Sequence, residues 1–310
     1  MEKVFELAQL VRTVEQMVYD DGVSRHTIFD LRHHGKLYNI HRGLYIDSEK
    51  YHALPPWDKY MIQHLAFARV AKNPVFSHES AAIFQSLCLI NVPRKIHVYC
   101  APSSRGSSRD VSKHPLLTDA VETPDCFGVA NARTTSLQIT VIDCAAKMSF
   151  REGVVLADSV FREHPVSLES LRDSLLSFRG KNSARVHAVA RAMSAKSESP
   201  GETLTRLILD ELGLDYQEQY SFRYENRSYR ADFYVEELNL FIEFDGQLKY
   251  EVFQPREEVV HLERRREREM MKMGHRLFRV DWDDVYRRPE RTKAELKRYI
   301  AQIQKPQKAA

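Results

Sequence analysis

The sequence is poor in cysteine and has no long apolar run. Its cysteines are widely scattered and none belongs to a CxxC pair: Cys88, Cys100, Cys126 and Cys144. Their spacing argues against a cysteine-based zinc site or a disulfide framework, and it favours reduced thiols in a cytoplasmic protein. Without an apolar run of about 18 residues, we expect no membrane span. The early acidic residues of the N-terminus also argue against a secretory signal.

A strong excess of charge of one sign is absent too. The formal net charge of +3 is too small to establish nucleic-acid binding by itself. The charge is uneven, however, because residues 256–310 are rich in arginine and lysine while the first fifty residues are near neutral. A basic C-terminal face suits a polyanionic ligand. A solvated helix of mixed charge is the alternative, since glutamates are interspersed there.

The length of 310 residues allows two or three domains. The polar segment SAKSESPG, residues 194–201, is typical of a linker. We therefore expect an α/β multidomain protein with three parts. These are a helical N-terminal part over residues 1–50, a mixed α/β middle domain over 51–195, and an α/β C-terminal domain over 196–310.

The first part, residues 1–50, shows the element order of a winged helix-turn-helix. Apolar periodicity over Val4–Val18 predicts one or two helices. A further helix is predicted over 24–34, with Ser24 as its N-cap and Gly35 as its terminating residue. The segment KLYNIHRGLYI then predicts a hairpin.

In a winged helix, helix 24–34 would enter the major groove of duplex DNA and the hairpin would form the wing. A protein-binding module of the same shape is the alternative. The polar side chains that could contact bases or phosphates are the candidate nucleic-acid-binding residues Arg25, His26, Thr27, Arg32 and Arg42.

The segment GVSRHTIFDLRHHGKLYNIHRGLYI resembles the winged helix of the AbiEi-type antitoxin family. The resemblance continues in the middle part, in HESAAIFQSL, IHVYCA and TSLQITVIDCAAKMSFREGVVLADSVFR. It implies a supporting domain that contacts partners, such as a toxin or a defence-system protein. We predict a strand over TSLQITVID, an exposed loop over SSRGSSRDVSK, and no catalytic cluster. His78, Glu79 and Ser80 are predicted to cap a helix start.

The third part predicts a helix, three strands, a long charged helix over 255–273, a fourth strand and a closing helix. This is the order of restriction-endonuclease-like folds, so we expect residues 196–310 to form a restriction-endonuclease-like α/β/α domain. Asp232 lies in the second strand and Glu243 in the third, and the turn residues between them predict a hairpin that brings the two acids together. Asp245 shares the strand face of Glu243, because side chains alternate along a strand. Lys249 follows nearby.

Two carboxylates on adjacent strands, with a cation beside them, suit metal-dependent hydrolysis of a phosphodiester. Magnesium prefers hard oxygen ligands and keeps several waters, so few carboxylates suffice. The alternative is a structural pair of acids that bind Arg230 or Arg206. Glu202, at the start of the preceding helix, is a further acid in the position where such sites often add one.

The order ETLTRLIL, YRADFYVEELNLFIEFDGQLKY and HLERRREREMMKMGHRLFRVDWDDV closely resembles the Vsr-like endonuclease domains (DUF559) of the PD-(D/E)xK superfamily, over about 110 residues. The resemblance implies Mg²⁺ or Mn²⁺ held by Asp232, Glu243 and the backbone carbonyl of Phe244. It implies Lys249 as the active-site cation, with help from Asp245 and Glu202. The residues that would contact phosphates are Arg264, Arg266 and Arg279.

The lysine position departs from the superfamily pattern. The lysine commonly lies two residues after the second acid, where this chain has Asp245, and Lys249 comes six residues after Glu243. The role of Lys249 and the number of metals therefore stay open.

We accordingly expect a DNA endonuclease or nickase that its own winged helix directs to duplex DNA. The resemblance implies a setting in phage defence or mobile-element biology. One alternative is an antitoxin-like transcriptional regulator with a non-cleaving C-terminal domain. Another is an RNA nuclease. A homodimer is compatible with the sequence, because cleavage of both strands usually needs two active sites.

Overall fold

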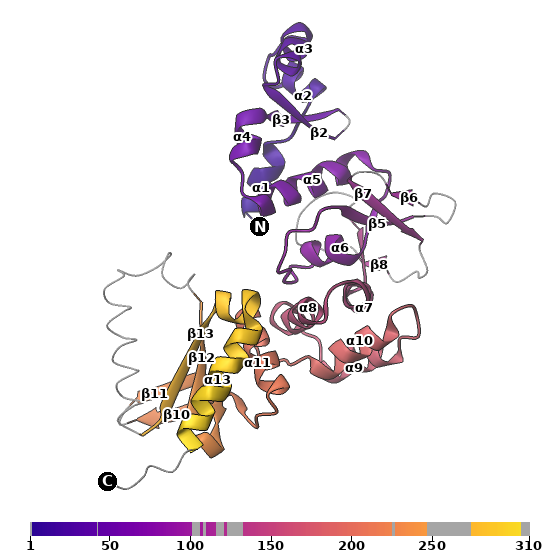
Figure 1. Cartoon of the computed structure of the whole chain (residues 1–310). Coiled ribbons are helices and arrows are strands. Elements are labelled where there is room, and N and C mark those ends of the chain that lie inside the picture. The colour runs from indigo at the N-terminus through magenta and orange to yellow at the C-terminus, as the bar shows by residue number, and fades with distance from the viewer. Residues whose placement is uncertain are drawn as a thin grey trace. The chain divides into compact units, whose positions relative to one another are not determined.

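The structure is a computed structural model, and the residues it describes are 2–41, 43–100, 106–107, 110–115, 121–122, 133–224, 227–246 and 274–304. Within these ranges the chain has a mixed α/β architecture with three sheets (Figure 1). It divides into two compact units. The N-terminal unit comprises residues 1–156 and 173–187, and the C-terminal unit comprises 157–172 and 188–310.

The N-terminal unit begins with helices and a small antiparallel sheet of strand order β1-β3-β2. The elements are α1 (Glu2–Gln9), β1 (Arg12–Thr13), α2 (Val14–Tyr19), α3 (Arg25–His33), β2 (Leu37–His41) and β3 (Leu44–Asp47). The Ser24 hydroxyl accepts a hydrogen bond from the Thr27 amide at 3.0 Å, and Gly35 ends the helix region at φ +69°. Both predicted signals for α3 are thus confirmed. Ile28 packs with Met17 and Tyr45 and holds α3 on the sheet.

A six-stranded sheet of order β6-β7-β5-β4-β9-β8 follows in the same unit. Its elements and the adjacent helices are α4 (Ser48–Ala53), α5 (Pro56–Val70), β4 (Val75–Phe76), α6 (His78–Phe84), β5 (Ile96–Cys100), β6 (Gly106–Ser107), β7 (Val111–Pro115), β8 (Val121–Glu122), β9 (Arg133–Thr135) and α7 (Leu137–Lys147). The core beside this sheet contains Phe76, Phe84, Ile96 and Val98.

Two sequence-based predictions are wrong here. The segment TSLQITVID, predicted as a strand, is mostly helix α7, because Ser136 caps it by accepting from the Ile139 amide and one helical face is buried. Tertiary packing overrides the strand preference of its β-branched residues. The predicted loop SSRGSSRDVSK contains the start of β7, which pairs in parallel with β5 from Val111 onward.

Three further helices have residues in both units: α8 (Phe150–Glu163), α9 (Leu168–Ser177) and α10 (Ser183–Ala192). Within the C-terminal unit, the buried Asp158 carboxylate of α8 accepts hydrogen bonds from the Ser194 amide, the Thr203 hydroxyl and the Arg206 guanidinium, each at 2.8 Å. These bonds fix the start of the next helix, α11 (Pro200–Glu211), which contains Thr203 and Arg206.

The C-terminal unit contains a four-stranded sheet of order β10-β11-β12-β13, in which only the last pair is parallel within the described residues. Its elements are α11 (Pro200–Glu211), β10 (Gln217–Tyr224), β11 (Arg227–Val235), the short helix η3 (Glu236–Leu238), β12 (Leu240–Asp245), β13 (Arg276–Asp281), the π-helix η5 (Asp283–Arg287) and α13 (Pro289–Gln304). The predicted succession along the chain of a helix, three strands, a fourth strand and a closing helix is therefore confirmed. The predicted helix 255–273 lies outside the described residues.

One face of this sheet carries the core of the unit. Phe233 and Ile242 are cross-strand partners, and they pack with Leu209 of α11 and Leu296 of α13. Figure 1 shows α11 and α13 alongside the strands. Among the residues that the structure describes, no helix has the length and apolarity needed to cross a membrane.

Candidate functional site

The acidic pair predicted from the hairpin lies on neighbouring strands. Strands β11 and β12 pair from Val235 opposite Leu240 to Phe233 opposite Ile242, and Asp232 and Glu243 are the next residues of the two strands. Glu243 is only 8% exposed, so its carboxylate is a buried polar group.

Asp232 is oriented by the backbone of the next strand. One of its carboxylate oxygens, Oδ2, accepts a hydrogen bond from the Phe244 amide at 2.8 Å. A carboxylate has two oxygens and several acceptor positions, so this bond orients the group and is compatible with a cation on the same side chain. The carboxylate thus bridges to β12 just beyond the last described backbone pair of the two strands.

Glu202 belongs to the first turn of α11 and is 8% exposed. Its Oε2 accepts from the Glu198 amide and from Gln219 Nε2, both at 2.8 Å, while Oε1 accepts from the Ser199 hydroxyl at 2.8 Å. Burial raises the pKa of Glu202, the bonds from Glu198 and Ser199 oppose that rise, and the nearby charge of Asp232 adds to it. Glu202 therefore supports the first turn of α11, whose N-cap is Ser199, and interacts electrostatically with Asp232.

Two more predicted residues lie on the strands next to this pair. Arg279 of β13 is the register partner of Glu243, and its Nε lies 3.9 Å from Glu243 Oε2. Its side chain is 33% exposed, so the guanidinium can meet both the acid and a ligand. Asp245 ends β12 opposite Asp281 and is part-buried.

A close approach of helix to strand shapes this site. The Phe244 ring lies directly against Gly201 of α11, and a Cβ added to Gly201 would be 2.0 Å from the ring atom Cζ. Only a glycine permits this separation without movement of the ring. Gly201 therefore sets the distance between α11, which carries Glu202, and β12, which carries Glu243.

Arg206 and Arg230 were the structural partners that the sequence offered for the two acids, and both bind other acidic residues. Arg206 binds Asp158 at 2.8 Å, and Arg230 binds Glu198 at 2.5 Å. Both guanidinium groups are therefore paired with acids other than Asp232 and Glu243.

Several predicted site residues lie outside the described part of the chain. They are Arg42, Lys249, Arg264 and Arg266. The described members of the predicted nucleic-acid-binding set on α3 are exposed, and they are Arg25, His26, Thr27 and Arg32.

The exposed face of α3 is polar with one aromatic residue. His26 faces Asp30 at 3.7 Å, and the Arg32 guanidinium lies over the Tyr45 ring at 5.0 Å. Phe29 is 62% exposed. Such a surface offers cations, a hydroxyl and a stacking ring to a ligand.

A second polar cluster was missed by the sequence analysis, which attributed His78, Glu79 and Ser80 to helix capping. That interpretation is wrong, because Ser77 is the N-cap of α6 and the three side chains make tertiary contacts. Glu79 accepts from Lys147 Nζ at 2.8 Å, and the Ser80 hydroxyl lies 2.7 Å from His64 Nε2. The one local signal was the group of polar residues at 78–80 after an apolar strand.

Comparisons with known proteins give little further information. No protein-family model matches the sequence, and no curated protein matches it. A crystal structure of the RV2827C protein from Mycobacterium tuberculosis is similar at a TM-score of 0.37 and 16% identity, covering 66% of this chain and 78% of that chain. A likeness at this level carries no argument about function.

Proposed function

We propose that the chain is a metal-dependent DNA endonuclease or nickase, with a C-terminal PD-(D/E)xK domain of the Vsr-like type. The observation that carries the proposal is the meeting of three acids from α11, β11 and β12, with an arginine of β13 beside them. Buried carboxylates are costly without compensation, and the arrangement concentrates negative charge at one end of a strand pair.

The donor set fits a hard divalent cation. Asp232, Glu243 and the Phe244 carbonyl would hold Mg²⁺ or Mn²⁺, since all three offer oxygen. A bound ion would offset charge on the phosphodiester and favour ionisation of the attacking water near neutral pH. The amide of Phe244 orients Asp232, and Glu202 anchors the start of α11 nearby.

The remaining roles follow from charge and position. Arg279 would contact a phosphate oxygen, because its side chain is part-exposed and adjoins Glu243. Asp245 would assist at the end of β12. For Lys249, Arg264 and Arg266 the proposal rests on the sequence resemblance alone.

Duplex DNA would be held by an N-terminal winged helix of the AbiEi type, with α3 as the recognition helix. The exposed polar face of α3 supports this assignment. We propose a cytoplasmic role in phage defence or mobile-element biology. A partner toxin or defence-system protein and a homodimer belong to the same hypothesis.

The test is conversion of supercoiled plasmid by the purified full chain in Mg²⁺ or Mn²⁺. We expect nicked or linear product from the wild type and none from Asp232→Ala or Glu243→Ala. Glu237→Ala is the matched control, because Glu237 is an exposed acid between the same two strands. Product of equal yield from all four proteins would refute the assigned acids.

A second candidate is an operator-binding regulator with a non-cleaving C-terminal domain. The observation that favours it is the exposed Arg25 and His26 at the start of α3, which suit DNA contact without cleavage. Duplex binding that weakens in Arg25→Ala, with no cleavage under either metal, would support this candidate. Cleavage of RNA in place of plasmid would support the RNA nuclease.

A further inference from the structure

Three histidines converge in the N-terminal unit, far along the chain from the acidic site. His78 begins α6, His97 lies in β5 and His114 lies in β7, and one ring nitrogen from each falls within 4.8 Å of the others. The strand register explains part of this, because β5 and β7 run in parallel with His97 opposite Ser112. His114 comes two residues later on the same face.

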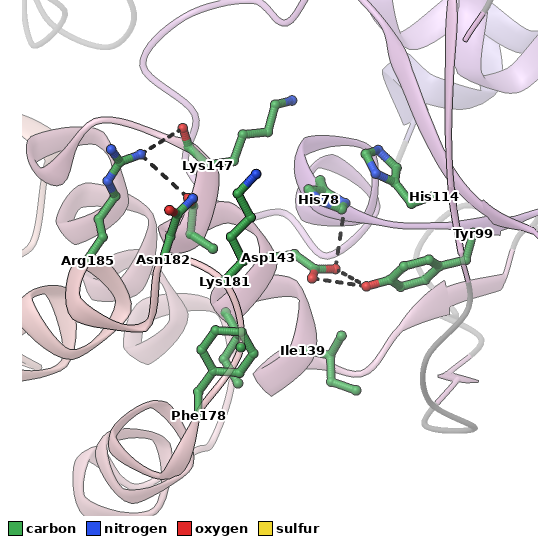
Figure 2. Close-up of a pocket in the computed structure, with 13 residues that line it drawn as sticks. His78, Tyr99, His114, Ile139, Asp143, Lys147, Phe178, Lys181, Asn182 and Arg185 are labelled. Atoms are coloured by element: carbon green, nitrogen blue, oxygen red, sulfur yellow. Dashed lines mark hydrogen bonds and ion pairs between the residues drawn. The ribbon is translucent and has the colours of Figure 1, made fainter. Parts of the chain in front are cut away.

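The cluster borders a cavity of about 760 Å³ that is mostly apolar. Figure 2 shows His78, His114, Tyr99 and Asp143 on one side of it, with Lys147, Lys181 and Arg185 on the other. All of these residues belong to the N-terminal unit. His97 is only 5% exposed and is not among the residues that line the cavity.

Two of the imidazoles direct nitrogen atoms at one another. His97 Nε2 lies 2.9 Å from Lys147 Nζ and 3.7 Å from Glu79 Oε2, so this nitrogen accepts from the ammonium. His97 Nδ1 lies 2.8 Å from His114 Nε2. In the neutral pair His97 Nδ1 carries the proton and donates it to His114 Nε2. Ligation of a metal ion through His97 Nδ1 requires that proton to move to His97 Nε2, where the Lys147 ammonium gives way and Glu79 Oε2, at 3.7 Å, accepts it.

The third imidazole is oriented by two oxygen atoms. His78 Nδ1 lies 3.0 Å from the Ser77 hydroxyl and 3.6 Å from Asp143 Oδ2. With Nδ1 so engaged, the nitrogen left for a metal ion is Nε2. The His78 ring stacks on His114 with centroids 4.1 Å apart, which keeps its ring close to the other two. Carboxylate contacts of this kind are the usual outer support of a ligating histidine.

The backbone agrees with a binding role. His78 has φ +52°, a left-handed conformation that costs energy in a residue other than glycine and that often marks functional sites.

We propose that His78, His97 and His114 bind one divalent transition-metal ion of the zinc class, with a further coordination position open to the cavity. Zinc–nitrogen bonds of roughly 2.0–2.1 Å place tetrahedral ligand atoms about 3.3 Å apart, so modest side-chain rotation completes the site. Nitrogen ligands distinguish this site from the oxygen ligands of the proposed nuclease site, which suit magnesium.

The test uses the full-length chain, stripped of metal by a chelator and titrated with Co²⁺ in excess Mg²⁺. We expect the intense visible absorption of a low-coordinate Co²⁺ site to saturate at one equivalent and to disappear when Zn²⁺ is added. His114→Gln should lose the absorption, while the control His52→Gln, an exposed histidine of α4, should keep it. Circular dichroism verifies that each variant is folded.

A second variant separates this site from the acidic one. Asp232→Asn/Glu243→Gln should retain the full Co²⁺ absorption, because its nitrogen ligands are intact. Loss of the absorption in this variant, or its survival in His114→Gln, would overturn the proposal. So would a folded wild-type chain that takes up no Co²⁺ and retains no Zn²⁺ after gel filtration.

Discussion

Replacing Gly201 by alanine tests how tightly α11 is held to β12. The added Cβ would lie 2.0 Å from Phe244 Cζ, 2.2 Å from Cε1 and 2.3 Å from Cε2. Carbon atoms in contact are about 3.5–4.0 Å apart, so the ring must move by roughly 1.5–2 Å. The amide of Phe244 is bonded to Asp232, which limits how far the strand can follow.

The magnitude comes from two opposing effects. Overpacking a buried contact costs typically 1–3 kcal/mol. Exchanging glycine for alanine inside a helix contributes up to about 1 kcal/mol in the other direction. We therefore expect Gly201→Ala to destabilise the C-terminal unit by about 1–2 kcal/mol. We also expect slower plasmid cleavage, because the strand that carries Glu243 shifts.

Urea unfolding followed by Trp282 fluorescence, in a Trp57→Phe background, reports on the C-terminal unit alone. The control is a double-mutant cycle with Phe244→Leu, whose smaller side chain makes room for the Cβ. In that background Gly201→Ala should be neutral or stabilising. Equal effects of Gly201→Ala in both backgrounds would refute the close approach as the source of its cost.

Three further predictions concern other residues. Arg206→Ala should destabilise the C-terminal unit by about 3–5 kcal/mol in urea unfolding, because the fully buried Asp158 carboxylate loses its guanidinium partner. An unchanged unfolding midpoint would contradict this. Burial lowers the pKa of His64 from 6.5 to about 4. Between these pH values the imidazole is protonated in the unfolded chain and neutral in the folded chain. The stability that His64 contributes is complete above pH 6.5 and is lost as the pH falls toward 4, by on the order of 3 kcal/mol; His64→Gln should remove that part of the acid dependence, and identical pH profiles would refute it. Arg279→Ala should weaken duplex binding and lower the slope of log affinity against log salt by about 1, and an unchanged slope would remove Arg279 from the phosphate contacts.

Local signals made part of the fold predictable. Ser24 and Gly35 mark the ends of α3 by side-chain and backbone chemistry that depends on a few neighbouring residues. The turn between Asp232 and Glu243 likewise determines the hairpin register, so the sequence alone brings these acids onto paired strands. Such features need no knowledge of the rest of the chain.

The histidine cluster could not be predicted in the same way. His97 and His114 meet only because β5 and β7 pair in parallel, and the start of β7 has the polar composition of a loop. Parallel pairing joins segments that no hairpin connects, so no short-range sequence pattern predicts it. The segment that forms α7 shows the same limitation. Its β-branched residues favour a strand, and only the packing of its buried face stabilises the helix.

We have proposed that Asp232 and Glu243 catalyse metal-dependent hydrolysis of DNA. The most direct test is the single-turnover rate of plasmid nicking in Mg²⁺, measured for wild type, Glu243→Gln and Glu237→Gln. We expect a loss of roughly 100-fold or more for Glu243→Gln, as for other groups that stabilise charge in a transition state, and a wild-type rate for Glu237→Gln. Nicking by Glu243→Gln at the wild-type rate, or no nicking by the folded wild type in Mg²⁺ or Mn²⁺, would contradict it.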